Sequence, residues 1–326
     1  MKEELLNYFN NDELAASVWQ GKYKLEGEET PDDMHKRMAE KFAKIEANYV
    51  INEDVKPLDS LSKYGKIREE LTYNKIYNLF KDFKYIIPQG SVMSMLGNPK
   101  IGSLSNCFVI GQPEDSYGGI MYKDQQMVQL MKRRGGVGLD ISTLAPKGRP
   151  VNNAAKTSTG AVSFAHRYSN STREVAQDGR RGALMLSMDI RHPDSLEFIQ
   201  SKRDLTKITG ANISVKLWDE FMKAVENDED YILRFPCDAE IHFDTSELEY
   251  NTLLPLWDCE DKSKTIGYIK KIKAKEYWDE IIKSAHNVAE PGLMFWDNMV
   301  EYSPDGVYPQ CKPITTNPCS EIGMQE

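Results

Sequence analysis

From Leu104 onward, short apolar runs typical of strands alternate with helical segments, and this alternation constrains the fold more than any other feature. Strands are predicted over 104–110, 136–142, 183–190, 211–217, 231–235 and 292–298, and helices near 119–133, 161–178, 193–203, 218–227 and 275–289. Strands separated by helices favour parallel pairing. The pattern therefore predicts an α/β domain with a largely parallel sheet and a charged insertion over 237–273.

The first part of the chain has a different pattern, typical of helices. Pro31 and the acidic residues after it form a helix start, and a periodic apolar run follows. Another helix is predicted over 67–83, whereas the glycines and prolines of 86–103 favour a loop. The sequence thus predicts a helical domain over 1–85 and an α/β domain over 86–326.

Composition excludes several functional classes. The 326 residues include 41 lysines and arginines and 50 acidic residues, a net charge of −9 that disfavours general binding to nucleic acids. No apolar run is long enough to predict a membrane span, and the N-terminus is acidic where a signal peptide is basic. We therefore expect no membrane partner and a cytoplasmic location. Neither the five cysteines nor the five histidines have a metal-binding spacing, so no metal site is expected.

Two cysteines differ in their surroundings. Cys107 lies in the apolar run Ser-Asn-Cys-Phe-Val-Ile, where a buried core thiol is the usual interpretation. Cys319 lies between Asn317 and Glu321 in a proline-interrupted segment. If that segment is extended, the three side chains share one face, so the carboxylate could act as a base and the amide as an orienting group. From these residues alone, a reactive site is only suggested.

The glycine-rich segment 133–138 has two interpretations. Its glycines allow close approach of a backbone to a ligand, or they form a helix end followed by a tight turn. The order of helix then strand disfavours a dinucleotide-binding fingerprint. The polar segment 152–160 is better explained as an Asx-rich turn than as a nucleotide contact.

Six motifs, in order, resemble the catalytic (α) chain of ribonucleotide reductase: LSNCFVI, RRGGVGLDIS, NSTREVAQDGRRGAL, TGANISV, EPGLMFWD and TNPCSEI. The resemblance implies a helical domain followed by the first half of a ten-stranded α/β barrel with a central finger loop. It also implies radical-based reduction of ribonucleoside (di)phosphates to 2′-deoxyribonucleotides.

The resemblance implies a role for each matching residue. Cys319 matches the cysteine that becomes a thiyl radical and takes the 3′-hydrogen, Glu321 the base on the 3′-hydroxyl, and Asn317 an amide that binds substrate. Cys107 matches one of two cysteines that deliver reducing equivalents at C2′. Further substrate contacts are implied at Ser91, Asn106, Gly136, Pro318 and Ser320.

The family also has an allosteric site for a deoxynucleoside triphosphate or ATP. The implied effector contacts are Asp115, Ser116, Tyr117, Lys147, Arg149, Lys202 and Lys207. The two specificity loops match 143–152 and 201–210. Family members usually have arginine at position 145, where this chain has alanine. Effector binding is therefore expected to be weaker unless Lys147 or Arg149 compensates.

The resemblance also implies partners. These are a homodimer mate, a thioredoxin-like external dithiol reductant, a radical source (adenosylcobalamin or a metal-radical partner subunit), and the C-terminal half of the reductase, in the same chain or a separate one. The second redox cysteine belongs to that half, so the isolated chain is expected to be inactive. Two alternatives remain open: a nucleotide-binding and dimerisation module without catalysis, and a cysteine hydrolase that pairs Cys319 with His166 or His192.

Overall fold

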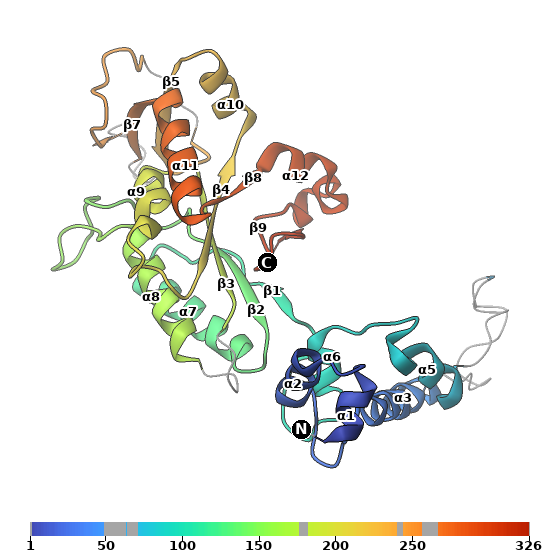
Figure 1. The fold of residues 1–326 in the computed structure, drawn as a ribbon. Coiled ribbons are helices and arrows are strands. Elements are labelled where there is room, and N and C mark those ends of the chain that lie inside the picture. The colour runs from blue at the N-terminus through green and yellow to red at the C-terminus, as the bar shows by residue number, and fades with distance from the viewer. Residues whose placement is uncertain are drawn as a thin grey trace. The chain divides into compact units, whose positions relative to one another are not determined.

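The computed structural model describes residues 2–48, 63, 71–175, 182–239, 244–255 and 267–325. These residues form two compact units, Met1–Asn106 and Cys107–Glu326 (Figure 1). Residues 86–106, which the sequence analysis placed in the second domain, belong to the first unit. Within the described ranges, no helix combines the length and the hydropathy needed to cross a membrane.

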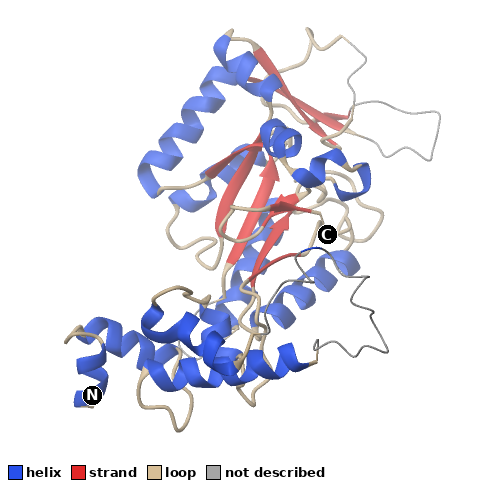
Figure 2. Ribbon diagram, turned by 90° about the vertical axis from the view of Figure 1, so that its right-hand side faces the viewer, coloured by secondary structure: helices blue, strands red, loops and turns tan. Residues whose placement is uncertain are grey.

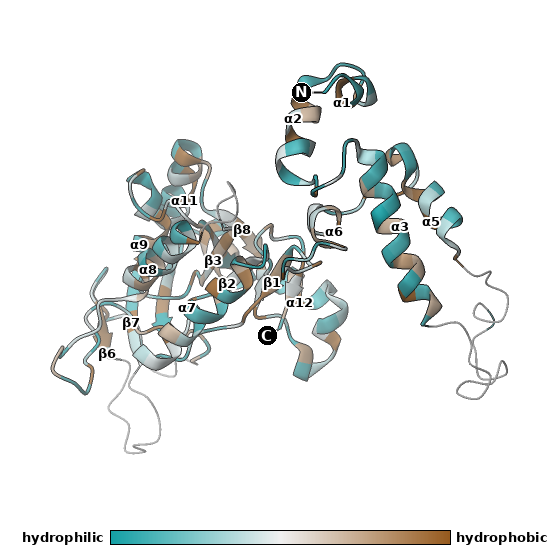
Figure 3. Cartoon of the chain, turned by 90° about the horizontal axis from the view of Figure 1, so that it is seen from below, coloured by the Kyte–Doolittle hydropathy of each residue, from teal (hydrophilic) through white to brown (hydrophobic). Residues whose placement is uncertain are grey.

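The first unit is helical, as predicted. Its helices are α1 (Glu3–Tyr8), α2 (Glu13–Lys22), α3 (Pro31–Ala47), α5 (Tyr73–Phe80), the 3-10 turn η2 (Lys81–Phe83) and α6 (Gly90–Met95). A capping box of Thr30 and Asp33 begins α3, whose hydrophilic and hydrophobic residues alternate along the helix (Figure 3). The apolar face of α3 includes Met34 and Met38, which are fully buried in the core of this unit.

Helix α6 corrects the prediction of a loop over 86–103. The Arg37 guanidinium, on α3, donates hydrogen bonds to the carbonyl oxygens of Met93 and Leu96 and so satisfies the end of the helix. Met93 and Leu96 also pack into the apolar core of the unit. These stabilising contacts come from residues far away in the sequence, so the local glycines and prolines did not reveal the helix.

The second unit is built on a five-stranded parallel sheet with the order β1-β2-β3-β4-β8 (Figure 2). Its strands are β1 (Cys107–Val109), β2 (Gly136–Asp140), β3 (Leu184–Asp189), β4 (Asn212–Leu217) and β8 (Gly292–Phe295). The connecting helices are α7 (Tyr117–Met131), α8 (Ala161–Glu174), α9 (Ser195–Gln200), the 3-10 turn η3 (Ser201–Arg203), α10 (Asp219–Glu226) and α11 (Ala274–Val288). This arrangement confirms the predicted α/β class and all five parallel strands.

Both faces of the sheet are covered. Every residue of β2 and β3 is buried, as in parallel sheets generally. Helices α7, α8, α9 and α11 lie along one side, and the short strand β9 (Thr315–Thr316) lies on the other (Figure 1). The apolar core forms mainly between the helices and the sheet, which leaves the other face to polar side chains and to β9.

The region 237–273 departs from the sequence analysis. Part of it forms strands β6 (Leu254–Pro255) and β7 (Tyr268–Lys273), which join β5 (Asp230–Phe235) in an antiparallel sheet of order β5-β7-β6. The lysines of β7 obscured the strand pattern. They are accommodated because Lys271 and Lys273 both pair with Asp230 on the neighbouring strand, at 3.1 and 2.6 Å. The sequence analysis described this region only as a charged insertion and assigned no strand to it, so β6 and β7 were missed.

The chain after β8 is compact. Trp296 begins helix α12 (Trp296–Tyr302), so the predicted strand over 292–298 ends earlier than expected. Two 3-10 turns follow, η4 (Pro304–Val307) and η5 (Pro309–Cys311). Strand β9 then pairs antiparallel with β10 (Gly323–Met324), with Thr316 opposite Gly323.

Candidate active site on the cysteine hairpin

A tight hairpin presents the three residues of the predicted reactive segment. Between β9 and β10, residues 317–322 form a closed turn rather than the extended segment that we expected, so that expectation is wrong. The Asn317 and Ile322 backbones are linked at 3.2 Å, and the Ser320 amide donates to the Asn317 carbonyl at 3.0 Å. Ser320 adopts the left-handed region, with φ 66°. The turn thereby exposes Cys319 and Glu321 at its tip.

The hairpin lies against β2 at a glycine. A β-carbon at Gly138 would lie 1.7 Å from the carbonyl oxygen of Thr316, so no other residue fits without displacing β9. Upstream, Arg134 has φ 75° and the Gly135 amide bonds to the Leu130 carbonyl at 3.0 Å, which ends α7. The helix-end interpretation of 133–138 is therefore confirmed, whereas close approach to a ligand stays a prediction. The backbone that approaches Gly138 belongs to the chain itself.

Two thiols and a carboxylate meet beside the hairpin. The Cys107 and Cys319 sulfurs and a Glu321 carboxylate oxygen all lie within 4.8 Å of one another. Cys107 is half-buried on β1, where it pairs with Gly136 of β2. The structure therefore brings together the three residues to which the resemblance gives the chemical steps, although 212 positions separate the two cysteines (319 − 107).

The surroundings keep the Cys319 thiol protonated. Partial burial raises the pKa of this thiol above its ordinary value, and the neighbouring Cys107 and Glu321 raise it further. A nucleophilic cysteine needs the opposite shift, because the thiolate is the nucleophile. A thiol that keeps its hydrogen suits chemistry in which the S–H bond itself exchanges a hydrogen atom.

Asn317 has one uncommitted donor. Its side chain is 3% exposed, and its Oδ1 accepts a hydrogen bond from the Ile322 amide at 3.1 Å, which closes the turn. Its buried Nδ2 has no hydrogen-bond partner among the residues that the structure describes. A buried donor without a partner is costly, so this amide is a candidate for contact with a ligand.

The other predicted substrate residues fall into two groups. In the helical unit, the Ser91 amide and hydroxyl both donate to Asn106 Oδ1, the former at 3.2 Å, and Asn106 Nδ2 donates to Gln89 Oε1 at 2.6 Å. On the hairpin, Pro318 is buried and the Ser320 hydroxyl lies 3.3 Å from Thr316 Oγ1. Ser91 and Asn106 thus contact one another, and Asn106 directly precedes Cys107 in the chain.

Three of the predicted effector residues lie around the start of α7. The Asp115 carboxylate accepts hydrogen bonds from the Ala145 amide at 2.9 Å and from Arg149 Nη1 at 2.7 Å. Ser116 caps α7 through the Gly119 amide, and the neighbouring Tyr117 is largely exposed. The Ala145 amide and the Arg149 guanidinium therefore bind the same carboxylate, that of Asp115.

The predicted lysines are not gathered at that point. Lys147 and Lys207 are exposed and lie 3.9 and 3.7 Å from Glu197 and Asp204. Lys202 is largely buried, and its ammonium donates to Glu290 and to the Ala211 carbonyl. Lys202 thus already has partners inside the fold.

A cavity of about 690 Å³ opens at the carboxyl ends of the parallel strands, where ligands of α/β proteins commonly bind. Asp115 and Arg149 line it. Sequence reasoning missed the other polar and aromatic residues of its wall, which include Asp189, Arg191, Lys216, Trp218, Cys237 and Trp296. Asp189 is the last residue of its strand and Trp296 directly follows another strand, and that position is the signal that could have identified these two residues.

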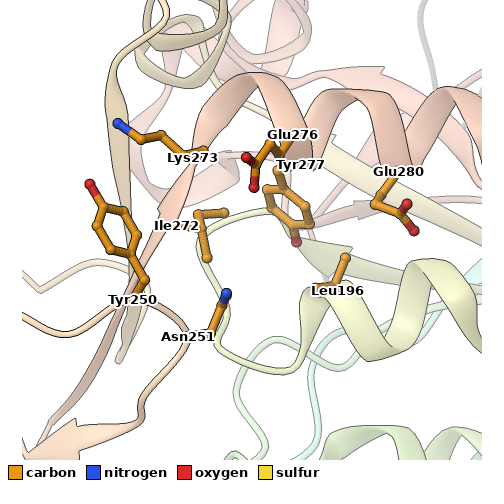
Figure 4. A pocket seen from close by; sticks show the side chains of 8 residues that line it. All are labelled: Leu196, Tyr250, Asn251, Ile272, Lys273, Glu276, Tyr277 and Glu280. Carbon is orange, nitrogen blue, oxygen red and sulfur yellow. The ribbon is translucent and has the colours of Figure 1, made fainter.

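A smaller hollow of about 330 Å³ lies elsewhere, against α9, β7 and α11. Figure 4 shows its apolar floor of Leu196, Ile272 and Tyr277, with Glu276 and Glu280 projecting from α11. Glu280 is paired with Arg203 at 2.7 Å. This hollow contains none of the predicted site residues.

The comparison with protein families decides the classification. Residues 105–326 match the family described as ribonucleotide reductase, barrel domain. The chain belongs to the ribonucleotide reductase family. The match covers β1 through β10 and therefore includes both cysteines of the cluster. Residues 1–104, which form most of the helical unit, lie outside this match.

Individual ribonucleotide reductases are similar over different shares of the chain. The chain is 29% identical over 352 aligned residues to a vitamin B12-dependent ribonucleoside-diphosphate reductase of Thermoplasma acidophilum, which covers 94% of the chain. It is 30% identical over 226 residues to the enzyme of the same name from Mycobacterium tuberculosis, and 27% identical over 200 residues to the large subunit of Caenorhabditis elegans. The chain spans 42%, 28% and 25% of the lengths of these relatives.

Proposed function

We propose that this chain contributes the radical cysteine and one redox cysteine to a ribonucleoside-diphosphate reductase. The observation that carries the proposal is the meeting of two thiols and a carboxylate within 4.8 Å on a hairpin that rests on Gly138. The family membership supplies the reaction class. Because the chain spans less than half the length of these relatives, the proposal places the rest of the active site in the C-terminal half of the reductase.

The proposed reaction begins and ends at the hairpin cysteine. The Cys319 thiyl radical takes the 3′-hydrogen of the ribose and becomes a thiol. Glu321 accepts the proton of the 3′-hydroxyl, which helps the 2′-hydroxyl leave as water. Cys107 and a second cysteine in the C-terminal half supply two hydrogen equivalents and become a disulfide. One equivalent protonates the departing 2′-hydroxyl and the other is added at C2′, and Glu321 returns its proton to the 3′-oxygen. Cys319 finally returns the hydrogen to C3′, so the net change replaces a hydroxyl with hydrogen.

Other groups on the hairpin bind and orient the substrate. The free Asn317 Nδ2 is placed to donate to a ribose hydroxyl, and the side chain is held by its Oδ1 bond to the Ile322 amide. Gly136, opposite Cys107, leaves the strand without a side chain where the sugar would lie. Pro318 and Ser320 shape the turn, and Ser91 and Asn106 are the further substrate contacts that the resemblance implies.

A radical source supplies the one-electron oxidation of the Cys319 thiol. The exposed position of Cys319 at the hairpin tip fits access by such a group. The names of the Thermoplasma and Mycobacterium relatives favour adenosylcobalamin over a metal-radical subunit. A thioredoxin-like dithiol would reduce the disulfide after each turnover, and the setting would be a cytoplasmic homodimer.

A deoxynucleoside triphosphate or ATP is the proposed effector. Asp115 is placed to bind a ribose hydroxyl, with Ser116 and Tyr117 beside it. Arg149 reaches the same carboxylate as the backbone of Ala145 and can thus replace the arginine usual at 145. Lys147 and Lys207 can add long-range attraction for phosphates. Lys202 would instead act through the loop that it braces.

The cysteine-hydrolase alternative has little support. His192 is buried with both ring nitrogens engaged, by the Leu144 carbonyl at 2.8 Å and the Asp194 amide at 3.0 Å. Burial and the nearby Lys207 lower the pKa of His166. The charged groups that act on His166 are Lys207, Glu197 and Asp204, and Cys319 is not among them. The raised pKa of Cys319 also opposes a nucleophilic role.

The test is reconstitution. The chain is combined with the C-terminal half of a related reductase, a radical source and a dithiol, and deoxynucleotide is measured. We expect product from the wild-type chain and none from Cys319→Ser. Product formation by Cys319→Ser, or effector binding without any turnover by the wild type, would overturn the proposal; the latter would favour a binding and dimerisation module.

A further inference from the structure

A buried carboxylate lies at the end of β2, next to the hairpin. Asp140 is 0% exposed, and each of its two carboxylate oxygens accepts two hydrogen bonds. Oδ1 accepts from Gln112 Nε2 at 2.6 Å and from the Ser142 amide at 3.1 Å, while Oδ2 accepts from Ser187 Oγ and Lys216 Nζ, both at 2.9 Å. Four donors, one of them the Lys216 ammonium, therefore surround this carboxylate.

This cluster reaches the hairpin strand by two bonds. Ser187 Oγ lies 2.8 Å from Thr315 Oγ1. Because the Ser187 hydroxyl gives its one hydrogen to Asp140, the Thr315 hydroxyl is the donor in this bond. Lys216 Nζ, in addition to its ion pair with Asp140, donates to the Ile314 carbonyl at 3.3 Å. The cluster thus holds Ile314, which directly precedes β9, and Thr315, the first residue of β9.

The hairpin needs such support. Strands β9 and β10 have two residues each, and an isolated two-stranded hairpin is marginal in water even when longer. Gly138 leaves space for the hairpin but does not attract it. The bonds from Ser187 and Lys216 supply directional attachment, and the Lys216 ammonium is further confined by the Trp296 ring, 4.9 Å away.

A buried ion pair is seldom the most stable choice for such a site. Apolar residues of similar volume usually stabilise a core at least as well, because two charges lose their hydration on burial. What the pair adds is direction, since each bond fixes a particular atom of β9. The cost of desolvation is therefore explained if the position of the hairpin matters to the protein.

We propose that Lys216, paired with Asp140, is a positioning residue that sets where the Cys319 thiol lies relative to Cys107. The pair acts through Ile314 and Thr315, five and four residues before Cys319. The significance for catalysis rests on the proposed function, whereas the positioning itself can be tested without substrate.

The test measures how readily the two thiols meet. Diamide accepts the two hydrogen atoms that the thiols lose on forming a disulfide, and the Cys107–Cys319 link is quantified by peptide mapping after alkylation. We expect the double variant Lys216→Met/Asp140→Asn, which avoids an unpaired buried charge, to form this link at least ten-fold more slowly than wild type. Lys216→Arg, which keeps the cation, should restore most of the rate.

A matched control removes a similar pair elsewhere in the same unit. Lys271→Met/Asp230→Asn deletes the pair between β7 and β5 and should leave the disulfide rate unchanged. The Tm of each variant is measured alongside, so that slow linkage in a folded protein is not mistaken for unfolding. A folded Lys216→Met/Asp140→Asn variant that links at the wild-type rate would overturn the proposal.

If that double variant does not unfold cooperatively, and so is not properly folded, the rate of disulfide formation is measured in Thr315→Val instead. This substitution removes one attachment without altering a charge, so several-fold slower linkage supports the proposal and a wild-type rate contradicts it. The assay contains neither substrate nor radical source. Slow linkage in a variant together with an inactive wild-type reconstitution would therefore refute the proposed function and leave the positioning role standing.

Discussion

Gly138 and Thr316 approach so closely that a β-carbon on residue 138 would lie 1.7 Å from the carbonyl oxygen of Thr316. The contact joins β2 to β9 and fixes the depth at which the cysteine hairpin lies on the sheet. Because the opposing atom is backbone, it cannot rotate away as a side chain could. Residue 138 must therefore be glycine because the hairpin packs against it, and not because its own backbone forms a turn.

Gly138→Ala should displace the hairpin and separate Cys319 from Cys107. We expect a loss of about 1–3 kcal/mol in the free energy of unfolding, the usual range for overpacking, and slower disulfide formation between the two thiols. Urea unfolding and diamide cross-linking measure the two effects. Gly21→Ala on α2, where an added β-carbon meets nothing within 4 Å, is the control; it should leave cross-linking unchanged and should not lower the free energy of unfolding, because alanine favours a helix. Unchanged cross-linking in Gly138→Ala would show that the contact does not set the hairpin position.

The reactivity of Cys319 should reflect its raised pKa. Because burial, Cys107 and Glu321 all disfavour the thiolate, alkylation by iodoacetamide should still be accelerating at a pH above the ordinary pKa of a cysteine. Glu321→Gln removes a negative charge and should lower the pKa, giving a several-fold faster reaction at pH 8. Glu226→Gln on the distant helix α10 should leave the profile unchanged. A pH profile of alkylation in Glu321→Gln identical to that of the wild type would show that this carboxylate does not raise the pKa of the Cys319 thiol.

Stability of the helical unit should fall in mild acid because of His35. Its two ring nitrogens are buried without partners among the described residues, and burial lowers the pKa of His35 below 6.5 despite Asp32, Asp82 and Glu28 nearby. The unfolded state then binds more protons below pH 6.5. The stabilisation from the neutral ring is therefore complete above that pH and is lost as pH falls toward the folded-state pKa.

Each unit of pKa difference for His35 is worth about 1.4 kcal/mol, so the urea midpoint of this unit should drop measurably between pH 7.5 and 5.5. Pulse proteolysis at increasing urea concentrations measures it. His35→Leu should flatten the dependence, whereas His286→Gln, an exposed position, should not. An equally steep dependence in His35→Leu would assign the effect to another group.

Effector affinity should depend on Arg149 more than on Lys147. A charge-assisted contact with phosphate is worth about 1.5–3 kcal/mol, so Arg149→Met should weaken binding of a deoxynucleoside triphosphate by roughly one to two decades. Lys147→Met should cost less, since that ammonium is exposed and screened. Calorimetry checks both, and a larger loss for Lys147→Met would reverse the assignment. Restoring arginine at position 145 is a poorer test, because Ala145 is 4% exposed and a large side chain there would be overpacked.

The sequence predicted the parts of this fold that are set by local pattern. The five parallel strands are continuous apolar runs, and Cys319 and Glu321 stood out because a proline and polar neighbours surround them. Features set by distant partners were missed. Helix α6 depends on Arg37, strand β7 on Asp230, and the turn at Cys319 on the bond between Asn317 and Ile322.

Lys216 and Cys107 are further cases in which partners far away in the sequence decide the role of a residue. Nothing in the local sequence distinguishes Lys216 from a surface lysine, because its partners Asp140 and Ile314 lie 76 positions before it (216 − 140) and 98 after it (314 − 216). The sequence placed Cys107 in a buried run, and the resemblance assigned its redox partner to the C-terminal half of the reductase. The structure adds that its sulfur lies within 4.8 Å of Cys319.

Cleavage of the 3′ carbon–hydrogen bond, measured apart from product, distinguishes the roles proposed for Cys319 and Cys107. In the reconstituted enzyme with 3′-labelled substrate, Cys319→Ser should abolish both label release and product, because an O–H bond is too strong to exchange hydrogen with the ribose. Cys107→Ser should retain label release and lose normal product, since that thiol acts later, at C2′. Label release by Cys319→Ser together with its loss in Cys107→Ser would contradict the account and exchange the roles of the two cysteines.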